Sequence, residues 1–460
     1  MSTGLDLLVR LDRGAAPLRA QLEDQLRDAV RSGRLAPGVA LPSPRSLGRE
    51  LGVSRGVVVD AYAQLAAEGY LVARQGAPTL VSDSASPAAG APHPASADRP
   101  PRFDFRPGGP DVSLFPRAAW LASLRRALRD APDARFDYGD PRGAPELRTA
   151  LTRYLGRVRG VACDPERVLV TSGMAQGMAL LARALVGRGA RRIGVEDPSS
   201  APGREQLTAN GLEVVPIPVD GDGLRVDLLE DLALDAAFAA PAHQFPLGVV
   251  LAPRRRAALI EWAARSGAVV LEDDYDAEYR YDRAPVGAVQ GLAPELVAYA
   301  GSVSKTLAPG LRLGWLVAPE RLAADVVSAK ATDDLGTPVV EQLALADFLE
   351  RGELDRHLRR TRAVYRARRD ALVSALAREL PECRPAGVAA GLHLVLHLPA
   401  GADERAVLAR ARSNGIGLYG LSEHGVEPGR PAVLLGYGRI AEAAIAAGTA
   451  ELAAAVRYAA

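Results

Sequence analysis

The residue with the most distinctive chemistry in this chain is a lysine. Of the 56 Lys and Arg residues only two are lysines, Lys305 and Lys330. A GC-rich coding bias towards arginine explains the bulk of this ratio, but a lysine retained in such a chain needs a chemical reason. A lysine amine can lose its proton and form an imine with an aldehyde, which an arginine cannot do. We therefore take Lys305 as a candidate nucleophile, with an ordinary surface lysine as the alternative.

The residues around Lys305 suit a phosphate group. Ser302 and Ser304 precede it, and Arg312 follows in the run Gly310-Leu311-Arg312-Leu313-Gly314. Two hydroxyls and a guanidinium match a phosphate dianion. A second anion site is predicted where a strand ends in Thr171-Ser172-Gly173-Met174 and a helix begins, because the free N–H groups of a helix N-terminus bind anions.

A third stretch supplies a carboxylate and a phenol. Glu272-Asp273-Asp274-Tyr275 follows an apolar strand. Asp273 could hold the proton of a ring nitrogen, and Tyr275 could hydrogen-bond a ring oxygen. Each of these motifs is common when taken alone. Together and in this order they describe pyridoxal phosphate, anchored by its aldehyde, its phosphate and its pyridine nitrogen.

The elements that must position these residues are apolar strands alternating with helices. Continuous apolar strands between helices indicate a mostly parallel sheet covered on both faces, with ligands at the carboxyl ends of its strands. The strands that we expect span residues 167–171, 192–195, 267–271 and 296–300.

Composition sets the broad class. The chain has 460 residues, a net charge of +1 and 48% hydrophobic residues, which suggests about three domains or lobes with ample cores. These values exclude a polycation and a mainly disordered chain. The presence of only two cysteines argues against a disulfide framework or a Cys-based zinc site and fits a reducing cytoplasm. No window is apolar enough for a membrane span, and the first residues do not resemble a signal peptide.

A small domain is expected over residues 10–82, followed by a disordered Ala/Pro/Ser-rich linker over residues 83–103 and a large domain over residues 104–460. In the small domain a first helix begins at Pro17. Ser43 and Ser54 are predicted to cap a second and a third helix, which form a helix-turn-helix. A hairpin turning at Gln75-Gly76 would be the wing.

PLRAQL, SGRLAPG and LPSPRSLGRELGVSRGVVVDAYAQLAAEGYLVARQG resemble the GntR-type winged helix. The resemblance implies DNA contacts from Ser43, Arg45, Ser54, Arg55 and the wing at Gln75-Gly76. Arginines on these helices can reach phosphates and guanine edges. A winged helix used only for protein contacts is the alternative, and the two arginines suit DNA better.

YGDPRGAPELRTAL, TSGMAQGM, HQFPLG, LEDDYDAEYRYD and SVSKTLAPGLRLGW resemble the fold type I aminotransferase lobe. The resemblance implies a mostly parallel α/β lobe with a smaller C-terminal α+β subdomain. It implies that Lys305 forms the Schiff base, that Asp273 keeps the pyridine nitrogen protonated and that Tyr275 lies near the ring oxygen. It implies a phosphate site made by Ser302, Ser304, Arg312, Gly173 and Met174, and Tyr138 reaching the phosphate of the neighbouring subunit.

A GntR-type winged helix, a linker and this lobe in one chain are similar to the MocR-type regulators. That resemblance implies a transcription factor that binds operator DNA and holds pyridoxal 5'-phosphate as an internal aldimine, alone or with an amino compound as effector. It also implies a head-to-tail homodimer, in which one subunit's DNA-binding domain lies against the other's large domain.

Some residues depart from the aminotransferase pattern. Ser200 stands where relatives carry an aromatic ring that stacks on the pyridine, and Leu434 stands where an arginine would bind the substrate carboxylate. Arg430 and Arg439 flank that position and are the possible substitutes. These departures favour sensing over turnover. A working aminotransferase with an attached DNA-binding domain and a regulator without cofactor are the alternatives.

His393 and His397 share one face of the predicted strand GLHLVLHL, a spacing that could be mistaken for a metal site. No cysteine or acidic residue lies close to them in sequence, so an ordinary strand is expected and no metal is assigned.

Overall fold

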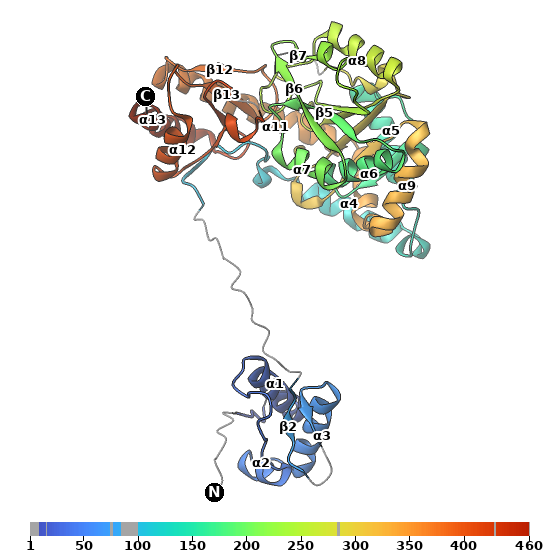
Figure 1. Ribbon diagram of the computed structural model, residues 1–460, viewed down its shortest axis with the longest axis vertical. Helices are drawn as coiled ribbons and strands as arrows, with labels where there is room; N and C mark the ends of the chain where they lie inside the picture. Colours follow the sequence, from blue (N-terminus) through green and yellow to red (C-terminus); the bar gives the residue numbers. More distant parts are fainter. Residues whose placement is uncertain are drawn as a thin grey trace. The chain divides into compact units, whose positions relative to one another are not determined.

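The apolar pattern of residues 18–81 produces three helices and a two-stranded hairpin. The computed structural model describes residues 9–14, 16–73, 77–83, 100–282, 286–426 and 429–459. They divide into two units, residues 1–98 and 99–460. The elements of the first unit, in blue in Figure 1, are α1 (Leu18–Arg31), α2 (Pro44–Glu50), α3 (Arg55–Ala67), β1 (Leu71–Val72) and β2 (Leu80–Val81).

Local sequence explains how the first unit is built. Ser43 and Ser54 cap α2 and α3 as expected, because their side chains accept hydrogen bonds from the backbone N–H groups of Ser46 and Val57. Gly48 lets the helices approach, since a Cβ there would lie 3.1 Å from the carbonyl oxygen of Val53. Buried Leu, Val and Ala side chains from all three helices form one core. α1 to α3 and the antiparallel β1–β2 pair therefore make a winged helix.

The second unit contains an eight-stranded sheet with the order β4-β11-β10-β9-β8-β5-β6-β7. β11 and β7 are antiparallel to their neighbours and the remaining pairs are parallel. The strands are β4 (Val168–Thr171), β5 (Arg192–Asp197), β6 (Glu213–Asp220), β7 (Gly223–Leu224), β8 (Ala236–Ala239), β9 (Val269–Asp274), β10 (Val297–Ser302) and β11 (Gly314–Val317).

Helices cover both faces of this sheet. One face packs against α6 (Met174–Gly187), α7 (Ala201–Ala209) and α9 (Glu320–Asp334). The other face packs against α8 (Pro253–Ser266) and, near β4, against α5 (Pro145–Arg159). α4 (Arg117–Asp130) and α10 (Val339–Glu350) pack on one another. Figure 1 shows α6, α7 and α8 around the green strands β5 and β6.

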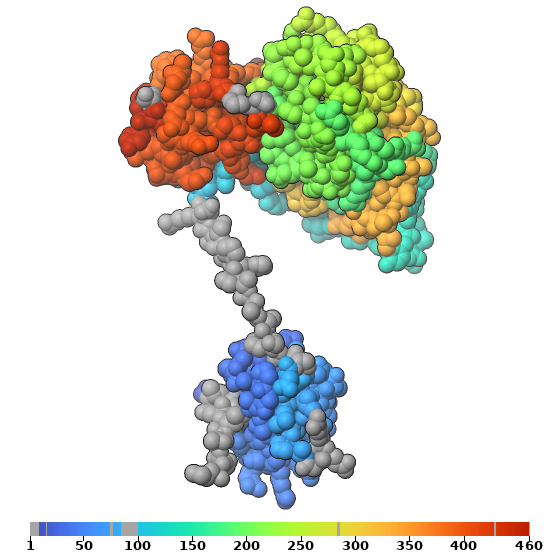
Figure 2. Space-filling view, viewed as in Figure 1, coloured from blue at the N-terminus to red at the C-terminus, as the bar shows by residue number. Residues whose placement is uncertain are grey.

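A smaller α+β subdomain follows the long helix α11 (Glu353–Glu379). Its sheet has the order β12-β13-β16-β15, and Figure 2 shows these orange and red residues as a lobe beside the green ones. Its elements are β12 (Arg384–Ala386), β13 (His393–His397), α12 (Glu404–Ser413), β14 (Ile416–Gly417), β15 (Tyr419–Gly420), β16 (Ala432–Gly436) and α13 (Glu442–Ala459).

The structure differs from the expected linker at one end. Phe103, which the sequence pattern placed in the linker, is 5% exposed and begins β3 (Phe103–Asp104), which pairs in parallel with β14. The reason is that the aromatic ring joins the core of the large unit, a contact that the Ala/Pro/Ser composition around it does not reveal. No helix among the described residues is long and apolar enough to cross a membrane.

Candidate functional site

Lys305 follows the carboxyl end of β10, at the strand edge where ligands are expected. Its Nζ donates a hydrogen bond to the backbone oxygen of Gly108. Burial lowers the pKa of its amine, while Asp276 and Asp273 oppose that shift. A lowered pKa increases the fraction of neutral amine, which is the form that attacks an aldehyde.

Asp273 lies on the neighbouring strand, since β9 continues through Asp274 and pairs Asp273 with Ala300 of β10. Its Oδ1 atom is buried and has no hydrogen-bond partner among the described residues. Burial raises the pKa of this carboxyl to about 7, and the positive charge of Lys305 opposes the rise. A buried acceptor without a donor is costly, and an aromatic N–H would satisfy it. The residue therefore fits a pyridinium nitrogen.

Tyr275 is held by a histidine–aspartate pair that the sequence analysis did not identify. The Tyr275 hydroxyl lies 3.1 Å from Nδ1 of His243, and the same nitrogen lies 2.9 Å from Oδ1 of Asp276. The rings of Tyr275 and His243 are stacked, with 5.9 Å between their centroids. His243 belongs to the HQFPLG run, so the motif was visible, but its contact with a residue 33 positions later was not.

His393 packs beside His243. Its ring centroid lies 5.3 Å from that of His243, and its Nε2 lies 3.1 Å from the carbonyl oxygen of Pro246. Burial lowers the pKa of His393 to about 4. The described residues contain no group of three or more His, Cys, Asp or Glu side chains that could hold a metal ion.

An anion cup forms where β4, β11 and β10 lie side by side. Gly314 of β11 pairs with Ser302 on one side and with Thr171 on the other, which brings the two predicted phosphate segments together. Gly173 has a φ of +99°, and a Cβ there would lie 2.8 Å from Nη2 of Arg312. Only glycine fits this position, which leaves the first amides of α6, from Met174 onward, open to an anion.

The side chains around the cup are also fixed. Nη2 of Arg312 donates to the backbone oxygen of Ser172, and Oγ of Ser302 accepts from the N–H of Ser304 at 3.4 Å. Arg312 itself has a left-handed φ of +50° at the end of a short helical turn, which is rare for a residue with a side chain. The predicted phosphate residues therefore share one edge of the sheet.

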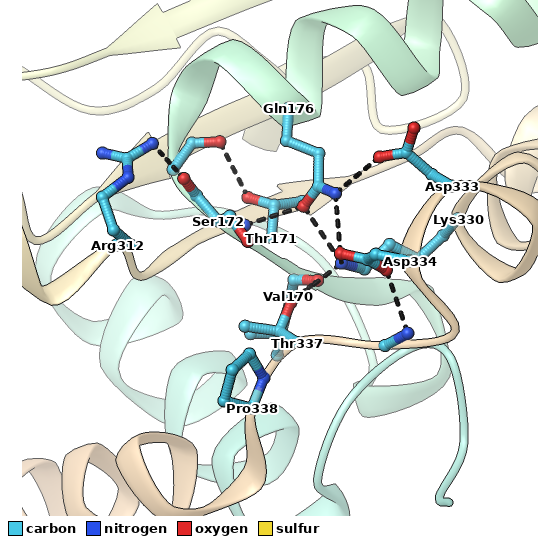
Figure 3. A network of polar contacts seen from close by, with 12 residues as sticks. Val170, Thr171, Ser172, Gln176, Arg312, Lys330, Asp333, Asp334, Thr337 and Pro338 are labelled. Carbon is cyan, nitrogen blue, oxygen red and sulfur yellow. Dashed lines mark hydrogen bonds and ion pairs between the residues drawn. The ribbon is translucent and has the colours of Figure 1, made fainter. Parts of the chain in front are cut away.

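Lys330 stabilises this cup indirectly, through Gln176. Its side chain is 0% exposed, and its Nζ donates to Oε1 of Gln176 at 3.0 Å, to Asp334 at 2.6 Å and to Oγ1 of Thr337 at 2.8 Å. The same Gln176 oxygen accepts the backbone N–H of Ser172 at 2.8 Å (Figure 3). Three acceptors around one ammonium explain why lysine stands here, since a planar guanidinium presents its donors in one plane.

Within the described part of the chain, no contact joins Tyr138 to the cofactor residues of its own subunit. Its side chain is 87% exposed and lines a hollow of about 600 Å³ together with Leu335 and Thr337. Phe136 and Leu335 are exposed apolar side chains on the same hollow.

The departures from the aminotransferase pattern also have definite places. Leu434 is 0% exposed and packs in an apolar cluster with Val395, Phe245 and Leu247, so that wall offers no charge to a carboxylate. Ser200 precedes the first residue of α7 and contributes no ring.

The candidate DNA-binding residues of the first unit lie at the starts of α2 and α3. Ser43, Arg45, Ser54 and Arg55 are all exposed. Among the described residues, neither arginine side chain makes a hydrogen bond or an ion pair. Gln75 and Gly76 lie outside the described residues.

An amine, a buried carboxylate and an anion cup at one edge of a mostly parallel sheet define the pyridoxal-phosphate-dependent transferase fold, here joined to a winged helix. Comparison with known families agrees. Residues 112–451 match the family described as "Aminotransferase class I and II", and residues 18–81 match "Bacterial regulatory proteins, gntR family".

Individual proteins give the same result. The chain is 33% identical to "Probable rhizopine catabolism regulatory protein MocR" of Rhizobium meliloti over 94% of its length and 92% of the relative's. It is 34% identical to "HTH-type pyridoxine biosynthesis transcriptional regulator PdxR" of Corynebacterium glutamicum, covering 88% of each chain. An archaeal alanine:glyoxylate aminotransferase structure superposes with a TM-score of 0.72 at 27% identity, over 77% of this chain and 91% of that one.

The chain therefore belongs to the MocR-type transcriptional regulators, which join a GntR-type DNA-binding domain to an aminotransferase-like domain. Pyridoxal 5'-phosphate is the cofactor that this fold implies.

Proposed function

We propose that occupancy of the cofactor site changes the affinity of this regulator for its operator DNA. The buried Oδ1 of Asp273 carries the cofactor part of this proposal. It lacks a hydrogen-bond donor, which the ring N–H of a pyridinium would supply, while the nearby amine of Lys305 would take the aldehyde. When bound, pyridoxal phosphate supplies an aldehyde that an amine can hold covalently. Binding then biases one of two domain arrangements, and that bias is read as operator affinity.

Each residue has one part in this site. Lys305 would take the aldehyde, and Asp273 would accept the ring N–H. Tyr275, positioned by His243 and Asp276, would hydrogen-bond the ring oxygen. The phosphate would be held by the cup of Ser302, Ser304, Arg312, Gly173 and Met174.

We propose that the protein does not turn over amino acids at a useful rate. Transamination in this fold uses an arginine at the position of Leu434, a ring stacked on the cofactor and a lysine that moves protons. The wall at Leu434 is apolar, and Ser200 provides no stacking ring. An active aminotransferase is the second candidate, favoured by the intact Lys305 and Asp273. Steady keto-acid formation from any amino donor by the purified protein would decide for it.

The working form that we propose is a head-to-tail homodimer. The exposed Tyr138 and the apolar side chains of Phe136 and Leu335 would be covered by the second subunit, and Tyr138 would reach that subunit's phosphate. Ser43, Arg45, Ser54, Arg55 and the wing at Gln75-Gly76 would contact DNA, and a dimer would read two half-sites. Because its partner is the chromosome, we place the protein in the cytoplasm.

The test is a gel-shift titration of the promoter with the full chain, with and without pyridoxal phosphate, beside the Lys305→Ala variant. We expect a visible absorption band that borohydride abolishes as it fixes the cofactor covalently to Lys305, and a shift in DNA affinity that the variant does not show. An identical DNA affinity with and without cofactor in a protein that binds it would overturn the proposal.

A further inference from the structure

Two adjacent glycines separate Lys305 from an arginine. The carbonyl oxygen of Gly108 accepts the hydrogen bond of Lys305 Nζ. On the next residue, a Cβ added to Gly109 would lie 2.0 Å from Nε and 2.2 Å from Nη2 of Arg439. The backbone of Gly109 is not in the left-handed region, so its conformation does not require glycine. Glycine is required by the guanidinium of Arg439, because that group occupies the space that a side chain at position 109 would fill.

Arg439 is brought there by the turn after β16. The N–H of Gly436 donates to the carbonyl oxygen of Phe105 at 2.6 Å, and a Cβ on Gly438 would lie 2.4 Å from the carbonyl oxygen of Gly109. Arg368 in turn donates to the carbonyl oxygen of Gly438 at 2.8 Å. The turn therefore lies directly along the segment 105–109 that contacts Lys305.

The guanidinium of Arg439 is available for a ligand. Its closest acid is Asp104, with 4.0 Å between Nη1 and Oδ2. That carboxylate is already engaged by Arg106, through contacts of 2.8 and 2.9 Å. Among the described residues Arg439 finds no hydrogen-bond acceptor, and its side chain is 43% exposed. Its charge also lowers the pKa of the Lys305 amine, as expected for a neighbouring cation.

Arg430, the other arginine near this strand, lies at its far end. In the pairing of β13 with β16, His397 is opposite Ala432 and His393 is opposite Gly436. Arg430 precedes that strand and lowers the pKa of His397 by its charge. Arg439 follows the strand, beside the cofactor lysine.

We propose that Arg439 is the anion clamp of this site and that the effector is an amino compound carrying a carboxylate. The inference rests on the proposed function, because it names the ligand class of the same site. The carboxylate would take the fork of Arg439, across Gly109, and the amine would face the cofactor beside Lys305. Aminotransferases carry this arginine at the position of Leu434. In this chain Arg439, five residues later, takes its place.

The experiment uses the full chain loaded with pyridoxal phosphate. Each of the twenty common L-amino acids is titrated while the absorption band of the bound cofactor is followed. For every amino acid that changes the band, the matching decarboxylated amine is titrated as well. The variants are Arg439→Gln, Arg439→Lys and Gly109→Ala, with Arg430→Gln as the matched control.

We expect Arg439→Gln to raise the half-saturating amino-acid concentration about ten- to a hundredfold, as for loss of a charged, forked contact. Gly109→Ala should also raise the half-saturating concentration, because the added Cβ displaces the guanidinium. Arg439→Lys should give a value between those of wild type and Arg439→Gln. Cofactor affinity should not change if Arg439 only binds the effector. A merely structural role for Arg439 would lower the cofactor affinity as well. The decarboxylated amine should act equally weakly on wild type and on Arg439→Gln.

Equal responses of wild type and Arg439→Gln would overturn the inference, as would a twenty-member panel that leaves the wild-type band unchanged. In those cases a cofactor-dependent shift in DNA affinity would still support the proposed function. A wild-type protein that stays colourless with pyridoxal phosphate would contradict both.

Discussion

At the scale of the residue, Asp273 shows how a folded chain can keep a buried polar atom unpaired until a ligand binds. Its side chain is half-buried, but the Oδ1 atom is fully buried without a donor, and the pKa of the carboxyl is raised to about 7. Leaving such a group unpaired destabilises the fold, and a ligand that brings a donor recovers that free energy. The cofactor-free protein is therefore less stable than its packing would allow.

Asp273→Asn should stabilise the cofactor-free protein at pH 8. The folded pKa lies above the ordinary value of 3.8, so the unfolded chain ionises first and wild type loses stability as the pH rises from about 4 to 7. Asparagine avoids that loss, which amounts to roughly 2–4 kcal/mol at pH 8 and fades towards pH 4. Urea unfolding of both proteins at several pH values measures it.

The same substitution should weaken cofactor binding, since a neutral amide no longer stabilises a charged ring nitrogen. A variant that is less stable than wild type at pH 8, with an advantage that appears only in acid, would contradict the assignment.

At the scale of the element, the cup at the start of α6 depends on the end of α9. Gln176 holds the N–H of Ser172, and Lys330 holds Gln176 together with Asp334 and Thr337. The network in Figure 3 therefore links the phosphate segment to the loop that lines the hollow around Tyr138.

Lys330→Met should weaken binding of pyridoxal phosphate while leaving binding of pyridoxal, which lacks the phosphate, nearly unchanged. The loss should be about tenfold, because the cup loses its order and not its charges. Spectroscopic titration with both vitamers measures it. Arg188→Gln is the control, since Arg188 also bonds α9, at Asp325, but contacts neither Lys330 nor Gln176. Equal loss for both vitamers would indicate general destabilisation instead.

The winged helix makes a prediction of its own. Arg55→Ala should reduce operator affinity about tenfold or more and lower the salt dependence of binding by about one counterion if the contact is to phosphate. Arg19→Ala, on α1 and paired with Glu23, should change neither. Fluorescence anisotropy at several salt concentrations separates the outcomes, and equal behaviour of the two variants would count against α3 as the reading helix.

Much of this architecture follows from local sequence. The caps at Ser43 and Ser54, the apolar strands and the residues at their carboxyl ends could be predicted, because each depends on neighbours in the chain. The choice between Arg430 and Arg439 could not, since it depends on how the turn after β16 packs along residues 105–109. Lys330 was marked by its rarity, but its partner Gln176 lies 154 residues away.

At the scale of the whole molecule, the site is proposed to be completed by a second copy. Tyr138 extends from the surface, 87% exposed, and makes no contact with the cup of its own chain among the residues that the structure describes. A side chain that serves the neighbouring subunit makes cofactor binding depend on assembly.

Mixing two defective proteins tests this arrangement. Tyr138→Ala and Lys305→Ala should each bind the cofactor poorly, the first by about tenfold. In a mixed dimer with a shared site, one pocket would carry both defects and the other none. Tight binding should therefore return in about a quarter of all pockets after subunit exchange. No recovery, in a mixture that light scattering shows to be dimeric, would mean that Tyr138 does not act across the interface.

The scarcity of lysine has a consequence for how faithfully such a protein could report on its vitamer. Reactive aldehydes ordinarily decorate many surface amines of a protein, and those adducts blur any optical or regulatory signal. Here the second lysine is sealed inside its ion pair. Even in a large excess of aldehyde, only one of the two lysine side chains, Lys305, would be free to form an imine.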